Sequence, residues 1–381
     1  MNKHSFFILP LAAAALASCS SLPSSSSSGK SISSETKSSS IAQSSSSTEV
    51  SSSSTKNSSS SKEASSSSSV SSNSSSNSSS SVDVSDLKWI TPTGAPTLAF
   101  YDQGSNTANW TSSSSPTTGV VPAFGTSDYD MIVFDGTSGL GVIAKNSYNY
   151  QLAQWISGGN FYVVSTKHTS ISEFQAGQTI DGFVKTGNAS KSFLKLSKDI
   201  WKWDYSDTEI AFEDGVAQVK TNLTANPSGH DYYIIAQPVL AAAKKALASQ
   251  TPAVTLNVVA NLQSEWKKAY NQATIPAAAL FVNKSSYEKK KDKIDAFMAI
   301  TQSRQDDAVN AIDKVTSALN AYGDDTAVTA RFGFTSALVS ALQPTNQFGI
   351  LKSGDITDKK AFANDFQTTL GASAFADSLF L

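Results

Sequence analysis

The sequence predicts an α/β protein with two mainly parallel sheets, each flanked by helices. Between residues 87 and 282, short apolar segments of strand type alternate with helical segments, which is the pattern of parallel sheets. The turns that join strand to helix repeatedly carry Gly and hydroxyl residues. From residue 285 onward the pattern is helical. The segment before residue 83 has a different composition and is considered first.

The N-terminal residues have the pattern of an export signal. Lys3 supplies a positive charge, and the apolar run 6–16 is too short to span a bilayer as a stable helix. The run ends in Leu-Ala-Ser-Cys at 16–19, which resembles the lipobox of bacterial lipoproteins. We expect residues 1–19 to be the lipoprotein signal, with Cys19 carrying the lipid anchor. The alternative is a plain secretory signal. Cys19 is the only cysteine, which excludes disulfides within the chain and cysteine-based metal sites.

Residues 20–82 are almost all serine. They cannot bury enough apolar area to offset the entropy of ordering, so we expect a disordered tether or a neutral spacer. The net charge is -2 and the rest of the chain has no basic stripe, which excludes nucleic-acid binding. The remaining residues, about 300, suffice for a two-lobed protein with a substantial core.

The first strand of the globular part, 87–90, leads into the polar turn 91–96. Pro96 suits the first turn of a helix that continues to residue 101. Thr93 is a suitable N-cap, and Gly94 lets a ligand approach the backbone closely. Because helix N-termini present unpaired N–H groups, this turn predicts a cradle for an anionic or polar small molecule. The alternative is an ordinary strand–helix turn without a ligand.

Two further turns of the same kind follow. The strand at 129–134 ends in Asp135-Gly136-Thr137-Ser138 and leads into a helix. A loose G-x-G-x-x-A at 139–144 suggests a dinucleotide site, but the next strand ends in Thr-Lys instead of an acidic residue, which argues against one. The strand at 180–184 precedes the turn 186–191 and a helix at 192–201.

The other elements complete the alternating pattern. The segment 103–118 is polar and is expected to be a loop. Further strands are expected at 150–155, 160–165, 209–212, 232–236, 255–261 and 277–282, and helices at 216–223, 237–249, 262–270, 287–320, 327–342 and 359–370. The two histidines of this part, His168 and His230, lack metal-ligand spacing, so we expect no metal site.

Several segments, in this order and spacing, resemble one known family: TPTGAPTLAFY, DYDMIVFDGTSGLG, GNASKSF, DYYIIAQPVLAAAKK and NLQSEWKKAYNQATIPAAALFVNK. The family is the substrate-binding proteins of ABC importers with the type II periplasmic-binding fold, of the nitrate, sulfonate, taurine and thiamine-precursor group. The resemblance covers residues 86–381. It implies two α/β lobes joined by two crossover strands, with lobe one at 86–170 plus 284–381 and lobe two at 171–283.

The resemblance also implies a ligand in the cleft between the lobes and no catalysis or cofactor. The partners would be a small polar or anionic solute, the ABC permease and ATPase subunits, and the membrane, through the lipid anchor on the extracytoplasmic face of the cell membrane. The chain would act as a monomer. The expected ligand-binding residues are Thr93, Gly94, Ala95, Asp135, Gly136, Thr137, Ser138, Asn160, Asn188, Ala189, Ser190 and Gln237.

Position 237 departs from the family, since Gln stands where relatives commonly have Glu. A neutral amide argues for a neutral or anionic ligand. Two other functions stay open. Chorismate-dehydratase-like enzymes share this fold, and fold does not fix function. The second is an adhesin or scaffold lipoprotein with a degenerate cleft, which predicts a cleft too filled or too apolar for a polar solute.

Overall fold

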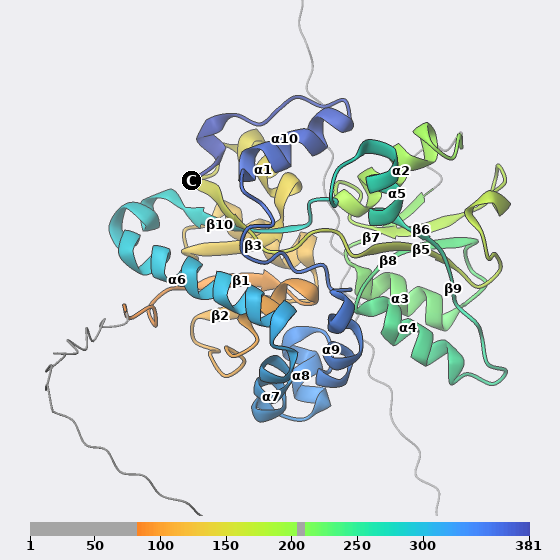
Figure 1. The fold of residues 1–381 in the computed structure, drawn as a ribbon, viewed down its shortest axis with the longest axis horizontal. Helices are drawn as coiled ribbons and strands as arrows, with labels where there is room; N and C mark the ends of the chain where they lie inside the picture. Colours follow the sequence, from red (N-terminus) through yellow and green to blue (C-terminus); the bar gives the residue numbers. More distant parts are fainter. Residues whose placement is uncertain (1–81, 204–209) are drawn as a thin grey trace, which may run out of the picture. The chain divides into compact units, whose positions relative to one another are not determined.

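Two five-stranded sheets organise the computed structural model, which describes residues 82–203 and 210–381 (Figure 1). The expectations for Cys19 and for the tether up to residue 81 lie outside the described residues. All described residues fall within one compact unit. No helix of that described part is long and apolar enough to cross a membrane.

Sheet one has the strand order β2-β1-β3-β10-β4. Strands β2, β1 and β3 pair in parallel, whereas β10 is antiparallel to both of its neighbours, β3 and β4. Four of its strands therefore run in one direction and β10 runs against them. The strands are β1 (Trp89–Pro92), β2 (Trp110–Ser113), β3 (Met131–Asp135), β4 (Tyr150–Trp155) and β10 (Ala278–Asn283).

Sheet two repeats this plan with the strand order β7-β6-β8-β5-β9. Strands β7, β6 and β8 are parallel, and β5 is antiparallel to β8 and β9. Both sheets are thus mainly parallel in direction, as predicted, with one reversed strand each. The strands are β5 (Phe161–Ser165), β6 (Ile180–Phe183), β7 (Ile210–Glu213), β8 (Tyr232–Ala236) and β9 (Asn257–Asn261).

The reversed strands are the ones by which the chain changes sheets. It leaves sheet one after β4 and enters sheet two as β5, and it returns as β10. The predicted lobe boundaries at 170 and 284 are therefore wrong, because β5 belongs to lobe two and β10 to lobe one. Each crossover continues directly into a strand that enters its new sheet from the cleft side, against its neighbours. The two crossovers lie side by side, with an antiparallel bridge between Gly158 and Pro276.

Helices cover both faces of each sheet (Figure 1). On sheet one, α6 to α9 and the short helix at 95–100 pack on one face, and α1 and α10 on the other. On sheet two, α2 and α5 pack on one face and α3 and α4 on the other. The helices are α1 (Gly136–Asn146), α2 (Asn188–Asp199), α3 (Val216–Ala225), α4 (Val239–Ala248), α5 (Leu262–Tyr270), α6 (Lys284–Asn310), α7 (Ile312–Tyr322), α8 (Asp325–Phe332), α9 (Ser336–Leu342) and α10 (Lys359–Thr369).

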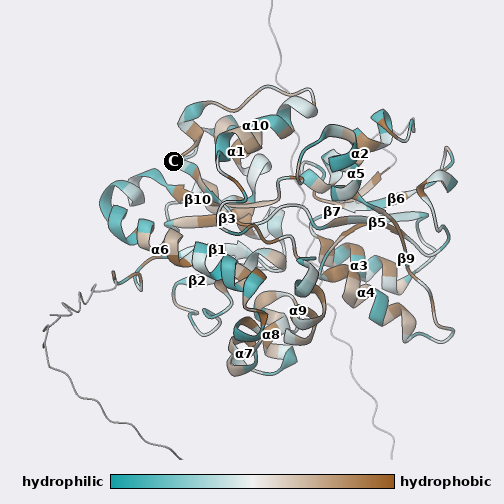
Figure 2. Cartoon of the chain, in the orientation of Figure 1, coloured by the Kyte–Doolittle hydropathy of each residue, from teal (hydrophilic) through white to brown (hydrophobic). Residues whose placement is uncertain are grey.

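The local sequence explains where these elements begin and what they bury. Strands β3, β8 and β10 are apolar runs that the helical layers enclose on both faces, and α6, which lies at the surface, is largely hydrophilic in Figure 2. Side-chain N-caps start several helices: Asn261 accepts from Ser264 N at α5, and Asn283 from Ser286 N at α6.

Several expected elements differ from the structure. The helix expected at 287–320 is interrupted at Ala311 and forms α6 and α7, and the helical segment at 327–342 forms α8 and α9. The segment 103–118, predicted to be a loop, contains the short edge strand β2. Its Trp110 is buried, stacks against Trp89 with ring centroids 6.3 Å apart, and donates from Nε1 to Thr91 Oγ1 at 3.0 Å. One large side chain in a polar segment was too little apolar patterning to predict a strand. The helix expected after Pro96 is a 3₁₀-helix, Ala95–Phe100.

Candidate functional site: the cavity between the lobes

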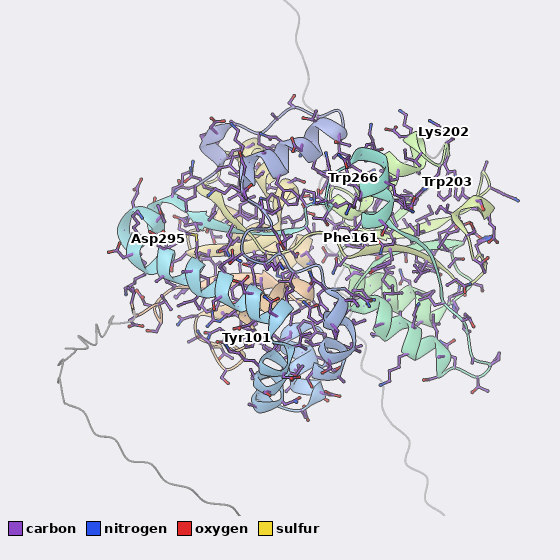
Figure 3. All side chains as sticks on the ribbon, viewed as in Figure 1. Tyr101, Phe161, Lys202, Trp203, Trp266 and Asp295 are labelled. Carbon is purple, nitrogen blue, oxygen red and sulfur yellow. The ribbon has the colours of Figure 1, made fainter. Side chains whose placement is uncertain are left out.

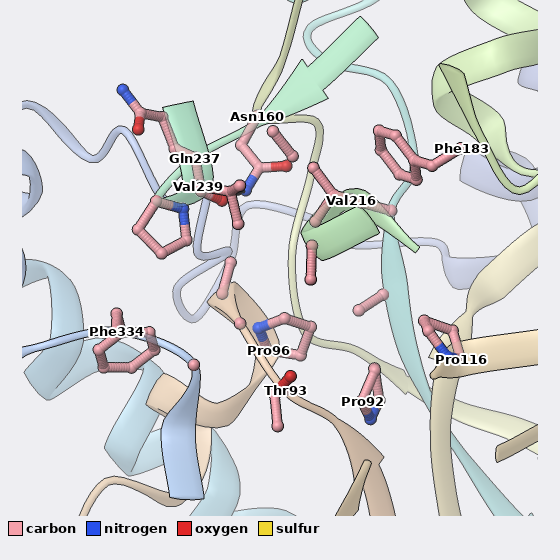
Figure 4. A pocket seen from close by; sticks show the side chains of 18 of the residues that line it. Pro92, Thr93, Pro96, Pro116, Asn160, Phe183, Val216, Gln237, Val239 and Phe334 are labelled. Carbon is pink, nitrogen blue, oxygen red and sulfur yellow. Dashed lines mark hydrogen bonds between the residues drawn. The ribbon is translucent and has the colours of Figure 1, made fainter. Parts of the chain in front are cut away.

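A cavity of ≈ 560 Å³ lies between the two sheets. Its walls are formed where strands end: by residues that follow β1 and β2 and the end of β3 in lobe one, and by residues that follow β6 and β8 in lobe two. The carboxyl ends of the strands are also where ligands of open α/β sheets bind. Figure 4 shows the cavity from close by, with Thr93, Pro96 and Phe334 on one side and Asn160 and Gln237 on another.

Most of the predicted ligand-binding residues lie at this cavity. Eight of the twelve line it: Thr93, Gly94, Ala95, Asp135, Asn160, Asn188, Ala189 and Gln237. The other four, Gly136, Thr137, Ser138 and Ser190, are not part of its lining. Ser190 is buried and donates to Phe183 O at 2.8 Å, inside lobe two.

The carboxylate of Asp135 joins the first turns of two helices from different lobes. One oxygen accepts from Ser138 N at 2.9 Å and caps α1, and the other accepts from Asn188 N at 3.0 Å at the start of α2. A negative charge is favourable at both places because helix N-termini carry partial positive charge. Burial raises the pKa of Asp135, whereas Lys191 and the two backbone N–H groups act in the opposite direction.

Three more hydrogen bonds hold the same contact. Thr137 Oγ1 donates to Asn188 Oδ1, and Asn188 Nδ2 donates to Pro276 O at 2.7 Å. Ser138 Oγ donates to Thr186 O at 2.7 Å. We call Asp135, Thr137, Ser138, Thr186 and Asn188 the interlobe seam.

The seam corrects one expectation from the sequence. The N-termini of α1 and α2 were expected to present free N–H groups to an anionic ligand, but the Asp135 carboxylate already occupies the position between them. The side chains of Thr137, Ser138 and Asn188 form hydrogen bonds with protein partners across the same contact.

In the turn at residues 93–96, which follows β1, most backbone N–H groups are also bonded to protein partners. Thr93 N donates to Ser113 O at 2.8 Å, Gly94 N to Phe332 O at 2.7 Å and Thr97 N to Gly94 O at 3.0 Å. Pro96 has no N–H to offer. A Cβ on Gly333 would lie 2.7 Å from Gly94 N, so the end of α8 packs directly against this turn. The predicted anion cradle at 93–96 is therefore mostly closed.

Sequence reasoning missed the apolar part of the lining. Val216 follows a strand–Gly–helix turn of the same kind as the three turns from which binding sites were predicted, so the sequence could have indicated it. Phe334 comes from the link between α8 and α9, where no local pattern indicated a cleft. The missed apolar residues are Pro92, Pro96, Pro116, Phe134, Phe183, Val184, Val216, Ala217, Ala236, Pro238, Val239, Ala242, Ala277, Ala278, Ala330, Phe334 and Leu338.

The amide side chains at the cavity are engaged with protein partners. Gln237 Nε2 donates to Gln347 Oε1 of lobe one at 3.0 Å, and its Oε1 accepts from Ala241 N at 3.1 Å. Asn160 Nδ2 donates to Gln237 O at 2.6 Å. Among the described residues that line the cavity, Lys220 is the only one with a cationic side chain.

A second contact joins the two lobes beside the cavity, next to the lining residues Pro116 and Val216. Thr117 N donates to Asp214 Oδ1 at 3.1 Å, and Thr118 Oγ1 donates to Asp214 Oδ2 at 2.9 Å. These groups are exposed, and they join the turn after β2 in lobe one to the turn after β7 in lobe two. We call this contact the interlobe latch.

Other candidate groups lie outside the cavity. The sequence also indicated five aromatic residues near the cleft: Trp89, Tyr101, Trp155, Phe161 and Tyr162. Of these, only Phe161 belongs to the described lining, and it lies between the lobes in Figure 3. Tyr101 is buried in the core of lobe one and donates to Asp307 Oδ2 at 2.8 Å. His168 is hydrogen-bonded to Gln178 at 3.0 Å. Within residues 82–203 and 210–381, no group of three or more His, Cys, Asp or Glu side chains could hold a metal ion.

Two α/β lobes that exchange strands around a cleft define the periplasmic-binding-protein fold, and solved structures share this arrangement. The ligand-binding component of an ABC-type import system from Staphylococcus aureus, with zinc bound, has a TM-score of 0.58 and 10% identity, covering 77% of this chain and 95% of that one. The alkanesulfonate-binding protein SsuA from Xanthomonas axonopodis pv. citri, bound to MOPS, has a TM-score of 0.53 and 10% identity, covering 77% and 98%.

A Candida albicans protein described as having the generic periplasmic binding protein fold is also similar. Its TM-score is 0.51 and its identity 10%, over 77% of this chain and 92% of that one. No family model matches the chain, and no curated protein does. At such low identities the likeness establishes the fold, and the role has to be argued from the site.

Proposed function

We propose that this chain is the extracytoplasmic solute-binding lipoprotein of an ABC importer. The observation that carries the proposal is the ≈ 560 Å³ cavity, which both lobes line at the carboxyl ends of their strands. A ligand held there touches both lobes at once. Its binding energy therefore favours the closed arrangement over an open one. The closed form would be the one that docks on the permease.

The remaining parts of the proposal rest on the sequence. Cys19 would carry lipid and hold the chain on the outer face of the cell membrane, and the serine-rich tether would give the receptor reach toward the permease and its ATPase subunits. The protein would act as a monomer, would need no cofactor and would catalyse no reaction.

One observation favours the scaffold alternative. That alternative predicts a cleft too filled or too apolar to hold a polar solute, and the lining is indeed mostly apolar. The cavity is not filled, however, and its volume lies within the range of about 300–1,000 Å³ typical of small-molecule sites. The two functions therefore differ in whether the lobes respond to a ligand.

Interlobe distance tests the receptor function. Spin labels at Thr326→Cys on α8 and Lys245→Cys on α4 report the separation of the lobes, in a Cys19→Ser background that leaves no other thiol. A receptor should show open and closed populations, with the small-molecule fraction of the culture medium shifting them toward the closed one. A single distance that no fraction changes would favour the scaffold.

Lipidation is tested separately. The chain expressed in a bacterium should incorporate labelled palmitate and fractionate with the membrane, and Cys19→Ser should abolish both. Incorporation that survives the substitution would contradict an anchor at Cys19.

A further inference from the structure

The polar groups around the cavity are mostly used within the protein. Asp135 and Asn188 hydrogen-bond across the interlobe seam, Gln237 bonds to Gln347, and Gly94 N is paired with Phe332 O. A ligand that needs several hydrogen bonds or a countercharge would have to compete with these partners. The remaining polar side chains of the described lining are the hydroxyls of Thr93, Ser114, Ser157, Thr329 and Thr335 and the amine of Lys220, so the cavity offers hydroxyl contacts and a single positive charge.

Apolar side chains from both lobes supply the rest of the lining. Phe334 of lobe one lies on one side of the cavity, and Phe183 and Val216 of lobe two lie on another (Figure 4). Pro96 and Pro116 add rigid apolar surface. Such a lining gains free energy by removing apolar ligand surface from water, and it penalises a charge that it cannot pair.

The charges present do not suit a charged ligand. The Asp135 carboxylate already accepts two backbone hydrogen bonds, and it stands at the point where an anion would meet the starts of α1 and α2. It occupies the backbone N–H groups that a ligand carboxylate or sulfonate placed there would need. Lys220, in the middle of α3, is the one cationic side chain among the described lining residues.

We propose that the ligand of this cavity is an uncharged, mainly apolar organic molecule, in place of the polar or anionic solute that the sequence suggested. This inference rests on the proposed function, since it names the ligand class of the same site. With a volume of ≈ 560 Å³, the cavity accommodates a ligand of two fused or linked rings. Lys220 is not needed to bind it.

Two fluorescent probes that differ by one charged group test the ligand class. N-phenyl-1-naphthylamine is neutral, and 8-anilinonaphthalene-1-sulfonate has the same ring skeleton with a sulfonate added. Titrated into the Cys19→Ser chain, the neutral probe should bind at least about tenfold more tightly than the sulfonate.

Two variants on one helix show whether the probes occupy the cavity. Ala242 on α4 lines it, so Ala242→Trp should weaken binding of the neutral probe by about tenfold or more. Ala248, at the exposed end of the same helix, lies outside the lining, so Ala248→Trp is the matched control and should bind as the parent does. Equal binding by all three proteins would overturn the proposal, because the probe would then bind elsewhere.

Lys220→Met decides whether charge recognition contributes. Neutral-probe binding should be unchanged in this variant. Tighter binding of the sulfonate than of the neutral probe, lost in Lys220→Met, would overturn the proposal and indicate an anionic amphiphile. Displacement of the neutral probe by millimolar methanesulfonate or nitrate would overturn it as well.

The interlobe distance measured with each probe separates this inference from the proposed function. If the sulfonate binds best and closes the lobes, the receptor function stands and the apolar ligand class fails. If the neutral probe binds in the cavity without changing the distance, the ligand class stands and the receptor function fails.

Discussion

The interlobe seam and the cavity beside it meet at Asp135 and Asn188 but have opposite chemistry. The seam is polar, and Asp135, Thr137 and Asn188 are each hydrogen-bonded to a protein partner. The cavity is mostly apolar, and the polar side chains that it offers a ligand are mainly hydroxyls. The polar residues at the strand ends thus hold one lobe to the other, whereas the apolar residues define what fits between them.

This difference explains why a polar turn is ambiguous evidence for a binding site. Glycines, hydroxyls and amides at helix starts mark positions near a cleft, because strand–helix turns gather there. The same groups can bond a ligand or the opposite lobe. Only the partners in three dimensions decide between the two, and here they are mainly protein.

Removing the central side chain of the seam should have the largest effect. Asn188→Ala leaves Thr137 Oγ1 and Pro276 O without their partner in a buried position, so we expect a loss of about 3 kcal/mol in the free energy of unfolding. Asn146→Ala, which removes an exposed hydrogen bond within α1, should cost under about 0.5 kcal/mol. Urea unfolding of both variants measures this. Equal stabilities would show that the seam does not hold the lobes.

The cavity wall at Gly333 should give an intermediate effect. Gly333 has φ 87° at the end of α8, and an added Cβ would lie 2.7 Å from Gly94 N. Backbone strain and this clash together should cost Gly333→Ala about 2 kcal/mol. Gly141→Ala is the matched control, because nothing lies within 4 Å of its Cβ position inside α1 and alanine should stabilise the helix by about 0.5–1 kcal/mol. Thermal unfolding compares the pair, and a destabilisation as large in Gly141→Ala would argue against a specific role for the Gly333 contact.

The interlobe latch should give the smallest effect, and one that depends on pH. Burial raises the pKa of Asp214, but hydrogen bonds from Thr117 and Thr118 outweigh it and hold the pKa below 3.8. The ionised carboxylate thus stabilises the closed arrangement above that pH, and this stabilisation is lost as the pH falls through the lowered pKa. Because the groups are exposed, we expect under about 1 kcal/mol.

Interlobe distances at neutral pH and at about pH 3 measure the latch. The parent should lose closed population on acidification, and Asp214→Ala should start with less of it and lose less. An identical response of the two proteins to pH would assign the change to other carboxyl groups.

The sequence predicted the order of strands and helices because most buried strands here are short apolar runs between glycine-containing turns. It missed β2, whose burial depends on the contact of Trp110 with Trp89 and not on a local pattern. It placed the lobe boundaries about ten residues late at β5 and a few residues late at β10, since strand pairing across sheets leaves no mark in periodicity.

The sequence predicted where the candidate site lies better than it predicted the mostly apolar character of its lining. Asp135 and Asn188 do lie at the cavity. Their hydrogen bonds in the seam, however, run between the lobes: Asn188 bonds to Asp135 and to Thr137, each some fifty residues away in the chain. Phe334 and Leu338 reach the cavity from the helical tail, where a hydrophobic residue is indistinguishable from a core residue by sequence alone.

The reversed strand β10 sets the order in which the lobes can be completed. It lies between β3 and β4, so β4 has no neighbour in sheet one until residues 278–283 are available. The strands of sheet two lie in one continuous stretch, from 161 to 261. A chain that emerges from its N-terminus first can therefore finish the second lobe while the first still waits for its missing strand, and exposed apolar edges of β3 and β4 are what a folding helper would have to shield in that interval.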